Sequence, residues 1–292
     1  MFVESVRLPG GQMIEFEVHG DGPALLLAVD PRPVEGEQAA SMRAWGADPA
    51  LGRSLIDGLR DRFRVVAVGY EAHVMAAPRP GTLTPDAVAR DLLAVADAAG
   101  ADRFAYYGYS WLGLAGLQLA LRTDRLSALV MGGYPPIDGP YAQMLKVTAT
   151  AHDMARAAAL DPPRPTGPPE PGDWSNAQVT TSEAQTGQFV TLYESLRGFD
   201  DRAALPPLTC PRLCVVGGAD VIEYPEQWGG TVVDIAGPVV RNLAELSALG
   251  WDVAVLDGLD HMQAMQAAAV LPVLRPWLES HLDPAAPPVP PR

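Results

Sequence analysis

The chain has 292 residues, with 21 Lys and Arg against 35 Asp and Glu, and a net charge of −14. A chain of this length buries about 75% of its unfolded surface, which suffices for one large core. Its acidity argues against nucleic acid and anionic membrane surfaces as partners. No apolar run reaches the roughly 20 residues that span a bilayer, and residues 1–7 do not resemble a signal peptide. We therefore expect a cytoplasmic protein.

The cysteines and histidines give no sign of a metal or cofactor. Cys210 and Cys214 are the two cysteines, and their C-x-x-x-C spacing is not a redox motif. We expect two buried thiols in a reducing compartment. The sequence contains no metal-ligand spacing such as H-E-x-x-H. The expected partner is thus a small molecule, with no cofactor and no metal.

Strand-type and helix-type runs alternate through the first half of the chain. Residues 3–7 and 13–18 predict an antiparallel hairpin, and 24–29 a strand buried on both faces. Thr84 and Pro85 predict the start of a helix that ends near residue 99. This alternation indicates an α/β fold with a mostly parallel sheet of about eight strands between helices. The other elements expected here are the helices 49–60 and 114–121 and the strands 65–68, 104–107 and 128–131.

The pattern changes between residues 138 and 207. Two helices are expected there, joined by a proline-rich segment that cannot form regular structure. Strands and helices then resume, and the last helix is expected to be interrupted at Pro272 and Pro276. We predict a core of residues 1–137 and 208–282, an inserted helical cap of residues 138–207 and a disordered tail of residues 283–292. The helices expected are 141–160, 182–196, 242–249 and 262–281, and the strands are 213–216 and 251–256.

Residues 108–113, Gly-Tyr-Ser-Trp-Leu-Gly, form the most informative motif. A strand-type run precedes the motif and a helix-type run follows it. A serine on a sharp strand-to-helix turn has its hydroxyl lifted clear of the sheet, near the N–H groups of the next helix. A serine hydroxyl also needs a base, and the base needs an orienting group. The motif therefore predicts Ser110 as a nucleophile that has partners elsewhere in the chain.

Both partners occur downstream of Ser110. Asp220 follows the strand-type run 213–216 and a turn, and His261 follows the run 251–256. This order of Ser, Asp and His, each after a hydrophobic run, resembles the α/β-hydrolase fold superfamily over about residues 1–282. The resemblance implies that Ser110, His261 and Asp220 form a catalytic triad beneath a helical lid.

Each of these residues alone has a simpler explanation. Ser110 would be a turn serine, Asp220 a turn former or helix cap, and His261 a solvated loop residue. Their common order favours the triad, with Asp260, next to His261, as a rival acid. The remaining histidines carry less information, and we expect His19 to be a surface turn residue.

The sequence departs from its relatives at the nucleophile turn and at the exit of the fourth strand. Relatives usually have a small residue at the position of Leu112, so we expect the turn to be slightly opened or rotated. Residues 69–73, Gly-Tyr-Glu-Ala-His, stand where relatives often have an Asp and a glycine-bearing turn.

A further departure concerns the oxyanion hole. Relatives usually carry a His-Gly pair after the third strand, and the N–H of the next residue binds the oxyanion. Here the matching residues 29–31 are Val-Asp-Pro, and Pro31 has no N–H. We expect the Trp111 N–H as one donor and Arg32 or another loop group as the second. One such donor is worth about 2.7–4 kcal/mol in rate terms.

These residues predict a hydrolase of a small ester, lactone or thioester. The side chains of Tyr109, Trp111 and Trp45 are expected to contact an apolar acyl substrate. A serine at position 110 argues against the dehalogenase and epoxide-hydrolase branches, which use Asp there. Two alternatives stay open: a non-hydrolytic lyase, cyclase or acyl-transfer enzyme on the same fold, and a ligand-binding protein with an idle triad.

Overall fold

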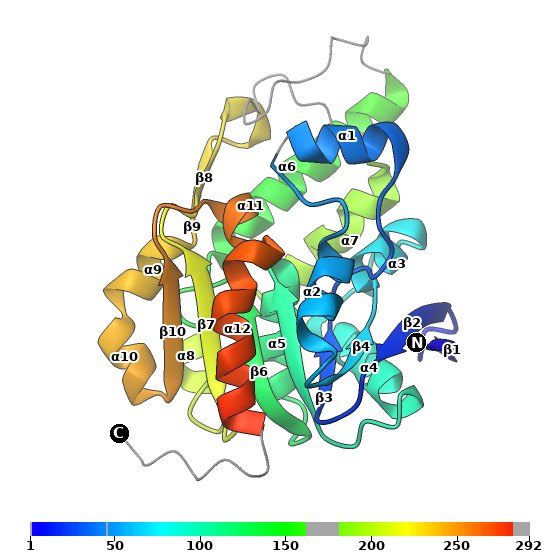
Figure 1. Ribbon diagram of the computed structural model, residues 1–292. Coiled ribbons are helices and arrows are strands. Elements are labelled where there is room, and N and C mark those ends of the chain that lie inside the picture. Colours follow the sequence, from blue (N-terminus) through cyan, green and yellow to red (C-terminus); the bar gives the residue numbers. More distant parts are fainter. Residues whose placement is uncertain (1, 45, 162–180, 283–292) are drawn as a thin grey trace.

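The computed structural model describes residues 2–44, 46–161 and 181–282. Within these ranges one eight-stranded sheet has the order β1-β2-β4-β3-β5-β6-β7-β10 (Figure 1), and β8 and β9 form a separate ribbon. All pairs from β4 to β10 are parallel, and β2 pairs antiparallel with both β1 and β4. The predicted sheet is therefore confirmed. The strands are β1 Phe2–Arg7, β2 Met13–His19, β3 Ala24–Leu27, β4 Arg64–Ala67, β5 Phe104–Tyr109, β6 Leu126–Gly132, β7 Arg212–Gly217, β8 Val221–Tyr224, β9 Thr231–Asp234 and β10 Trp251–Leu256.

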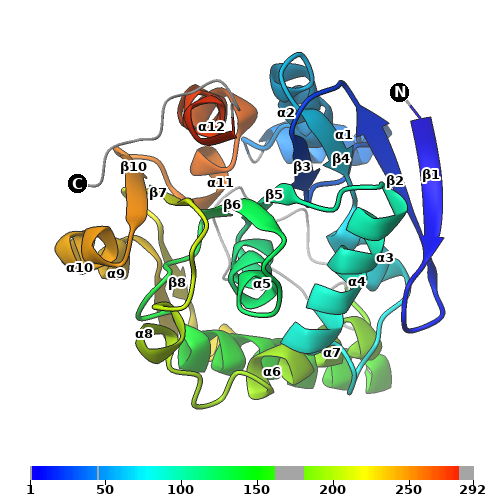
Figure 2. The same ribbon diagram turned by 90° about the horizontal axis from the view of Figure 1, so that it is seen from below.

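Helices cover both faces of this sheet (Figure 2). The helices α2 and α12 pack on one face, and α4, α5, α9 and α10 pack on the other. None of the described helices is long and apolar enough to cross a membrane. The helices are α1 Gly36–Ala44, α2 Leu51–Leu59, α3 Tyr70–Ala76, α4 Pro85–Ala98, α5 Trp111–Ala120, α6 Tyr141–Leu160, α7 Glu183–Glu194, α8 Asp201–Ala204, α9 Ala236–Arg241, α10 Leu243–Ala248, α11 His261–Ala264 and α12 Ala267–Leu282.

The closing segment differs from the expected single helix broken by prolines. It consists of the short α11 and then α12, which runs through Pro272 and Pro276 without interruption. Both prolines lie on the exposed side of α12, four residues apart. The carbonyls of Ala268 and Pro272, which lose a helical N–H donor, therefore face water, which satisfies them.

The segment between β6 and β7 is helical. Its helices α6 and α7 pack at one end of the helical layer that contains α4 and α5 (Figure 2). The helices α6 and α7 pack against each other in antiparallel fashion. A capping box of Ser182 and Gln185 starts α7. Residues 162–172 of the predicted proline-rich connector, and the predicted tail at residues 283–292, lie outside the described residues.

The elements absent from the prediction are the helices α1, α3, α8 and α9 and the β8–β9 hairpin. In the hairpin, the chain leaves the core directly after Asp220 and returns to it at Ile235. The N–H groups of Ile235 and Ala236 both donate to the Asp220 carbonyl oxygen, each at 3.0 Å. Both ends of the hairpin are therefore fixed at the backbone of the predicted acid.

Candidate active site

Ser110 occupies a strained turn between β5 and α5. Its φ is 57° and its ψ is −129°, in a region that L-residues rarely adopt. The Ser110 N–H donates to the Gly132 carbonyl at 2.8 Å, and the Ser110 carbonyl accepts from the Gly113 N–H at 2.8 Å. The buried strand and helix on either side hold this conformation. Backbone strain of this kind is concentrated at functional sites.

The turn is tight because glycines permit close backbone contacts. A Cβ at Gly108 would overlap the Leu112 carbonyl oxygen, and one at Gly113 would lie 2.8 Å from the Gly132 oxygen. The expectation that Leu112 opens the turn is wrong. The Leu112 side chain packs into the core instead, and its carbonyl accepts a hydrogen bond from the Tyr106 hydroxyl at 2.8 Å.

Asp220 and His261 meet at the carboxyl ends of two neighbouring strands. The Nδ1 of His261 lies 2.8 Å from Oδ2 of Asp220. Asp220 is fully buried, and the His261 side chain is 18% exposed. The rival acid, Asp260, is instead occupied as the N-cap of α11, where its carboxylate accepts from the Gln263 N–H at 2.8 Å. The geometry therefore pairs the imidazole with Asp220.

Ser110 and His261 line the same cavity, which has a volume of about 870 Å³. Most of its walls are apolar or aromatic, with Tyr134 after β6, and Ile222 and Val233 from the hairpin. The described lining residues include Glu223 and Asp260 but no Lys or Arg. Among the described residues no hydrogen bond joins the Ser110 hydroxyl to His261. Such contacts in unliganded sites often tighten only when substrate binds.

The oxyanion donors predicted from the sequence are only partly available. Trp111 is the first residue of α5, so its N–H has no partner within the helix and stays free for an anion. The prediction for Arg32 is not supported, because its N–H donates to Oδ1 of Asp30 at 2.9 Å and its side chain pairs with the same carboxylate. Arg32 also lines a different cavity, of about 550 Å³, which does not include Ser110 among its described lining residues.

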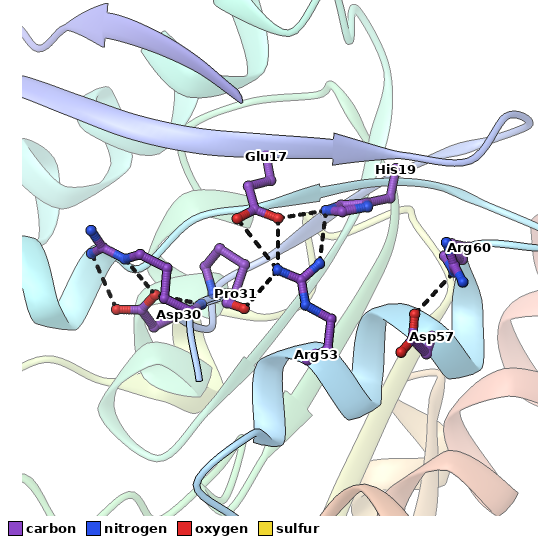
Figure 3. A network of polar contacts seen from close by, with 8 residues as sticks. Glu17, His19, Asp30, Pro31, Arg53, Asp57 and Arg60 are labelled. Atoms are coloured by element: carbon purple, nitrogen blue, oxygen red, sulfur yellow. Dashed lines mark hydrogen bonds and ion pairs between the residues drawn. The ribbon is translucent and has the colours of Figure 1, made fainter. Parts of the chain in front are cut away.

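A polar network holds the loop after β3 in this position (Figure 3). Arg53 of α2 donates to the Pro31 carbonyl at 3.0 Å and to the Glu17 carboxylate at 3.1 Å. Glu17 also contacts Nε2 of His19 at 2.7 Å. The prediction of a surface turn for His19 is thus wrong, because its side chain is 4% exposed and contributes to this buried network. The Pro31 carbonyl is directed at α2, and the following N–H is occupied by Asp30.

The aromatic residues predicted to bind substrate have different positions. Tyr109 lies behind the imidazole, with ring centroids 5.1 Å apart, and its hydroxyl donates to the His261 carbonyl at 2.8 Å. Trp111 packs edge-on against Phe189 of α7, at 5.3 Å between centroids. Trp45 lies outside the described residues. Tyr109 therefore supports the position of the His261 ring. The hairpin residues that form part of the cavity wall were not among the predicted site residues.

Comparisons with known proteins agree with this architecture. No protein-family profile matches the chain. The protein RutD of Azorhizobium caulinodans, named as a carbamate hydrolase, is 22% identical over 233 residues, which cover 73% of this chain and 79% of that protein. An enol-lactonase from Burkholderia xenovorans LB400 is 19% identical, with a TM-score of 0.59 over 94% of this chain and 99% of that one. A thermophilic esterase from Thermogutta terrifontis is also 19% identical, with a TM-score of 0.57 over 97% of this chain and 100% of that one.

These likenesses, together with the strand order, establish the fold. The protein has the α/β-hydrolase fold, as the order of its motifs in the sequence indicated. At this level of identity the comparison concerns the fold, and the chemistry has to be argued from the site itself.

Proposed function

We propose that the protein is a serine hydrolase that cleaves a small ester, lactone or thioester. The observation that carries this proposal is the Asp220–His261 hydrogen bond beside a serine in a strained turn, with Ser110 and His261 in one cavity. Other folds with this constellation use it for acyl transfer. The names of the lactonase and esterase with similar structures point in the same direction.

In the proposed reaction, the Asp220 carboxylate accepts a hydrogen bond from the Nδ1–H of His261, and this tautomer leaves Nε2 unprotonated as the base. Nε2 takes the proton of Ser110 as the serine oxygen attacks the substrate carbonyl. The Trp111 N–H stabilises the oxyanion. The imidazolium then protonates the leaving group, and an acyl-serine remains. Water attacks this ester with His261 again as the base, which releases the acid and restores Ser110.

The oxyanion loop favours a second candidate, a non-hydrolytic enzyme on the same fold. Pro31 has no N–H and the Arg32 N–H is bonded to Asp30, so neither supplies the second donor in this conformation. A lyase or cyclase reaction that develops less charge on a carbonyl oxygen would tolerate this loss. A ligand-binding protein that retains an idle triad is the third reading.

One experiment separates these functions. The purified protein and its Ser110→Ala variant are screened with p-nitrophenyl esters of increasing chain length, with lactones and with acyl thioesters. Serine hydrolysis predicts turnover that the variant lacks. Turnover equal in both proteins, or none in either, contradicts the proposal. Labelling by a fluorophosphonate without any turnover would favour the non-hydrolytic enzyme.

A further inference from the structure

The β8–β9 ribbon presents one of its two faces to the cavity that contains the proposed catalytic residues. Ile222 lies directly opposite Val233 in the antiparallel register, so both side chains are on the same face of the ribbon. Both residues line the cavity, and Val233 is fully buried. Val232 has the alternate position and is 53% exposed. The ribbon therefore has an inner apolar face toward the cavity and an outer face toward water.

The other walls of the cavity are mainly apolar or aromatic. They include Met144 of α6, Tyr193 of α7 and Tyr134, which follows β6. Tyr134 and Tyr193 are each 2% exposed, so they belong to the deep part of the cavity. Burial raises the pKa of both hydroxyls above the ordinary value of tyrosine, so these side chains add no charge.

The two acidic residues of the cavity lining are placed at its exposed rim. Glu223 lies opposite Val232 in the ribbon, on the outer face, and the Asp260 carboxylate caps α11 by accepting from the Gln263 N–H. Both acidic residues are exposed. Apart from His261, no cationic side chain lines the cavity among the described residues. An anionic group of a substrate would therefore be buried there without a partner, which is unfavourable.

The cavity, with a volume of about 870 Å³, is large for an acetyl group. Ligand pockets in proteins commonly enclose about 300–1,000 Å³ and bind drug-sized molecules. Each methylene group that leaves water for an apolar wall strengthens binding by about fourfold. A longer acyl chain therefore gains affinity for as long as it remains between these walls.

We propose that the cavity binds an uncharged, extended apolar acyl group, and that Ile222 on the inner face of the ribbon determines the specificity for it. The inference rests on the proposed hydrolase function and adds the substrate class to it. The acyl group is the part of the substrate that stays bonded to Ser110 after the leaving group departs. The same walls therefore hold it through both steps, and the chemistry remains with Ser110, His261 and Asp220.

The first test measures kcat/KM for p-nitrophenyl esters that differ only in the acyl group. From acetate to hexanoate we expect an increase of about threefold to fourfold for each added methylene. The mono-p-nitrophenyl ester of adipate carries a carboxylate in place of the terminal methyl of the hexanoate. Its kcat/KM should be lower than that of the hexanoate by about a hundredfold, because its charge is left unpaired. Equal values for all chain lengths, or for the adipate and hexanoate esters, overturn the proposal.

The role of Ile222 is tested with the ratio of kcat/KM for hexanoate to that for acetate. Ile222→Trp fills part of the cavity and should lower this ratio by about tenfold. Val232→Trp adds the same ring to the outer face and should leave the ratio unchanged. Ile222→Ala, which removes wall contacts without filling space, should lower the ratio by about threefold, and it serves if the larger side chain prevents folding. A ratio that neither Ile222 variant changes overturns the role of this residue.

The second test measures binding without catalysis. The methyl ketones 2-octanone and 7-oxooctanoate have the same chain and differ in the terminal carboxylate. They are titrated calorimetrically into Ser110→Ala protein, which should bind the neutral ketone at least about tenfold more tightly. The added change Ile222→Trp should weaken binding of 2-octanone about tenfold. Equal binding of both ketones overturns the proposal. If no ester is hydrolysed, the hydrolase function fails and the binding result alone decides this inference.

Discussion

The Asp220 carboxylate and the His261 imidazole are 2.8 Å apart in space and 41 residues apart in sequence. The pairing of β7 with β10 brings them together, because Gly217 lies opposite Leu256 at the ends of these parallel strands. Each strand is followed by a loop that carries one of the two residues. The hydrogen bond therefore depends on the register of two strands, and the sheet acts as its rigid support.

Replacement of Ser110 by alanine should abolish both esterase turnover and labelling by a fluorophosphonate, because the proposed nucleophile is removed. Ser280→Ala is the matched control, since among the described residues its exposed hydroxyl bonds only the Trp277 carbonyl and Nδ1 of His281. Labelling is read by intact-mass spectrometry. Retention of one label in the Ser110 variant would assign the nucleophile elsewhere.

Asp220→Asn should lower kcat by about 10³–10⁴-fold, because an amide neither orients the required imidazole tautomer nor stabilises its charge. Asp260→Asn should leave kcat near the wild-type value, since asparagine caps a helix about as well as aspartate. Both variants are compared on the same ester at saturating concentration. If the Asp260 change were the damaging one, the acid would be misassigned.

Pro31→Ala should raise kcat on simple esters by about tenfold to a hundredfold, because it restores an N–H at the loop position from which relatives of this fold bind the oxyanion. KM should change little, since this donor acts on charge that develops in the transition state. Pro33→Ala, which removes the proline two residues further along the same loop, is the control. Lower activity in the Pro31 variant would show that the ring is needed to shape the loop.

Gln188→Ala should destabilise the protein by about 1–3 kcal/mol, because it leaves buried backbone groups unpaired. Gln188 is fully buried in α7, where it accepts from the Arg79 N–H at 3.1 Å and donates to the Val74 carbonyl at 3.0 Å. Urea unfolding measures the change, with the exposed Gln143→Ala as control. An unchanged midpoint would mean that α7 is held mainly by other contacts.

Asp201→Asn should stabilise the protein at neutral pH, and the gain should shrink as the pH falls. Burial raises the pKa of the Asp201 carboxyl in the folded state. The folded state therefore prefers the protonated form, and the wild type loses stability as the pH rises through the range between the unfolded and folded pKa values. The amide keeps an acceptor for the Gly139 N–H. Melting temperatures of both proteins from pH 4 to 8 test this, and a difference independent of pH would contradict it.

The sheet, most helices and the meeting of Asp220 with His261 could be predicted because they follow from local patterns. Hydrophobic runs mark the strands, and parallel strands bring their following loops to one edge. The hairpin β8–β9 also left a local signal, since Val221, Ile222, Glu223 and Tyr224 alternate before a turn with Gly229 and Gly230. The signal is weak, because β8 has four residues and is partly exposed.

Other features depend on tertiary contacts that no local pattern encodes. His19 is buried because Glu17 and Arg53 satisfy its polar ring in the folded state. Arg32 is unavailable because a carboxylate two residues earlier takes its N–H.

The fixed ends of the β8–β9 hairpin have a consequence for variation of this scaffold. Ile235 and Ala236 both return to the Asp220 carbonyl, so the chain re-enters the core where it left. Ribbons of other lengths and sequences could therefore be grafted between these anchors without displacement of the acid. Since Ile222 and Val233 form part of the cavity wall, each graft would present a new wall to the same Ser110. The hairpin is thus an exchangeable module, through which a library of substrate preferences could be built on one unaltered framework.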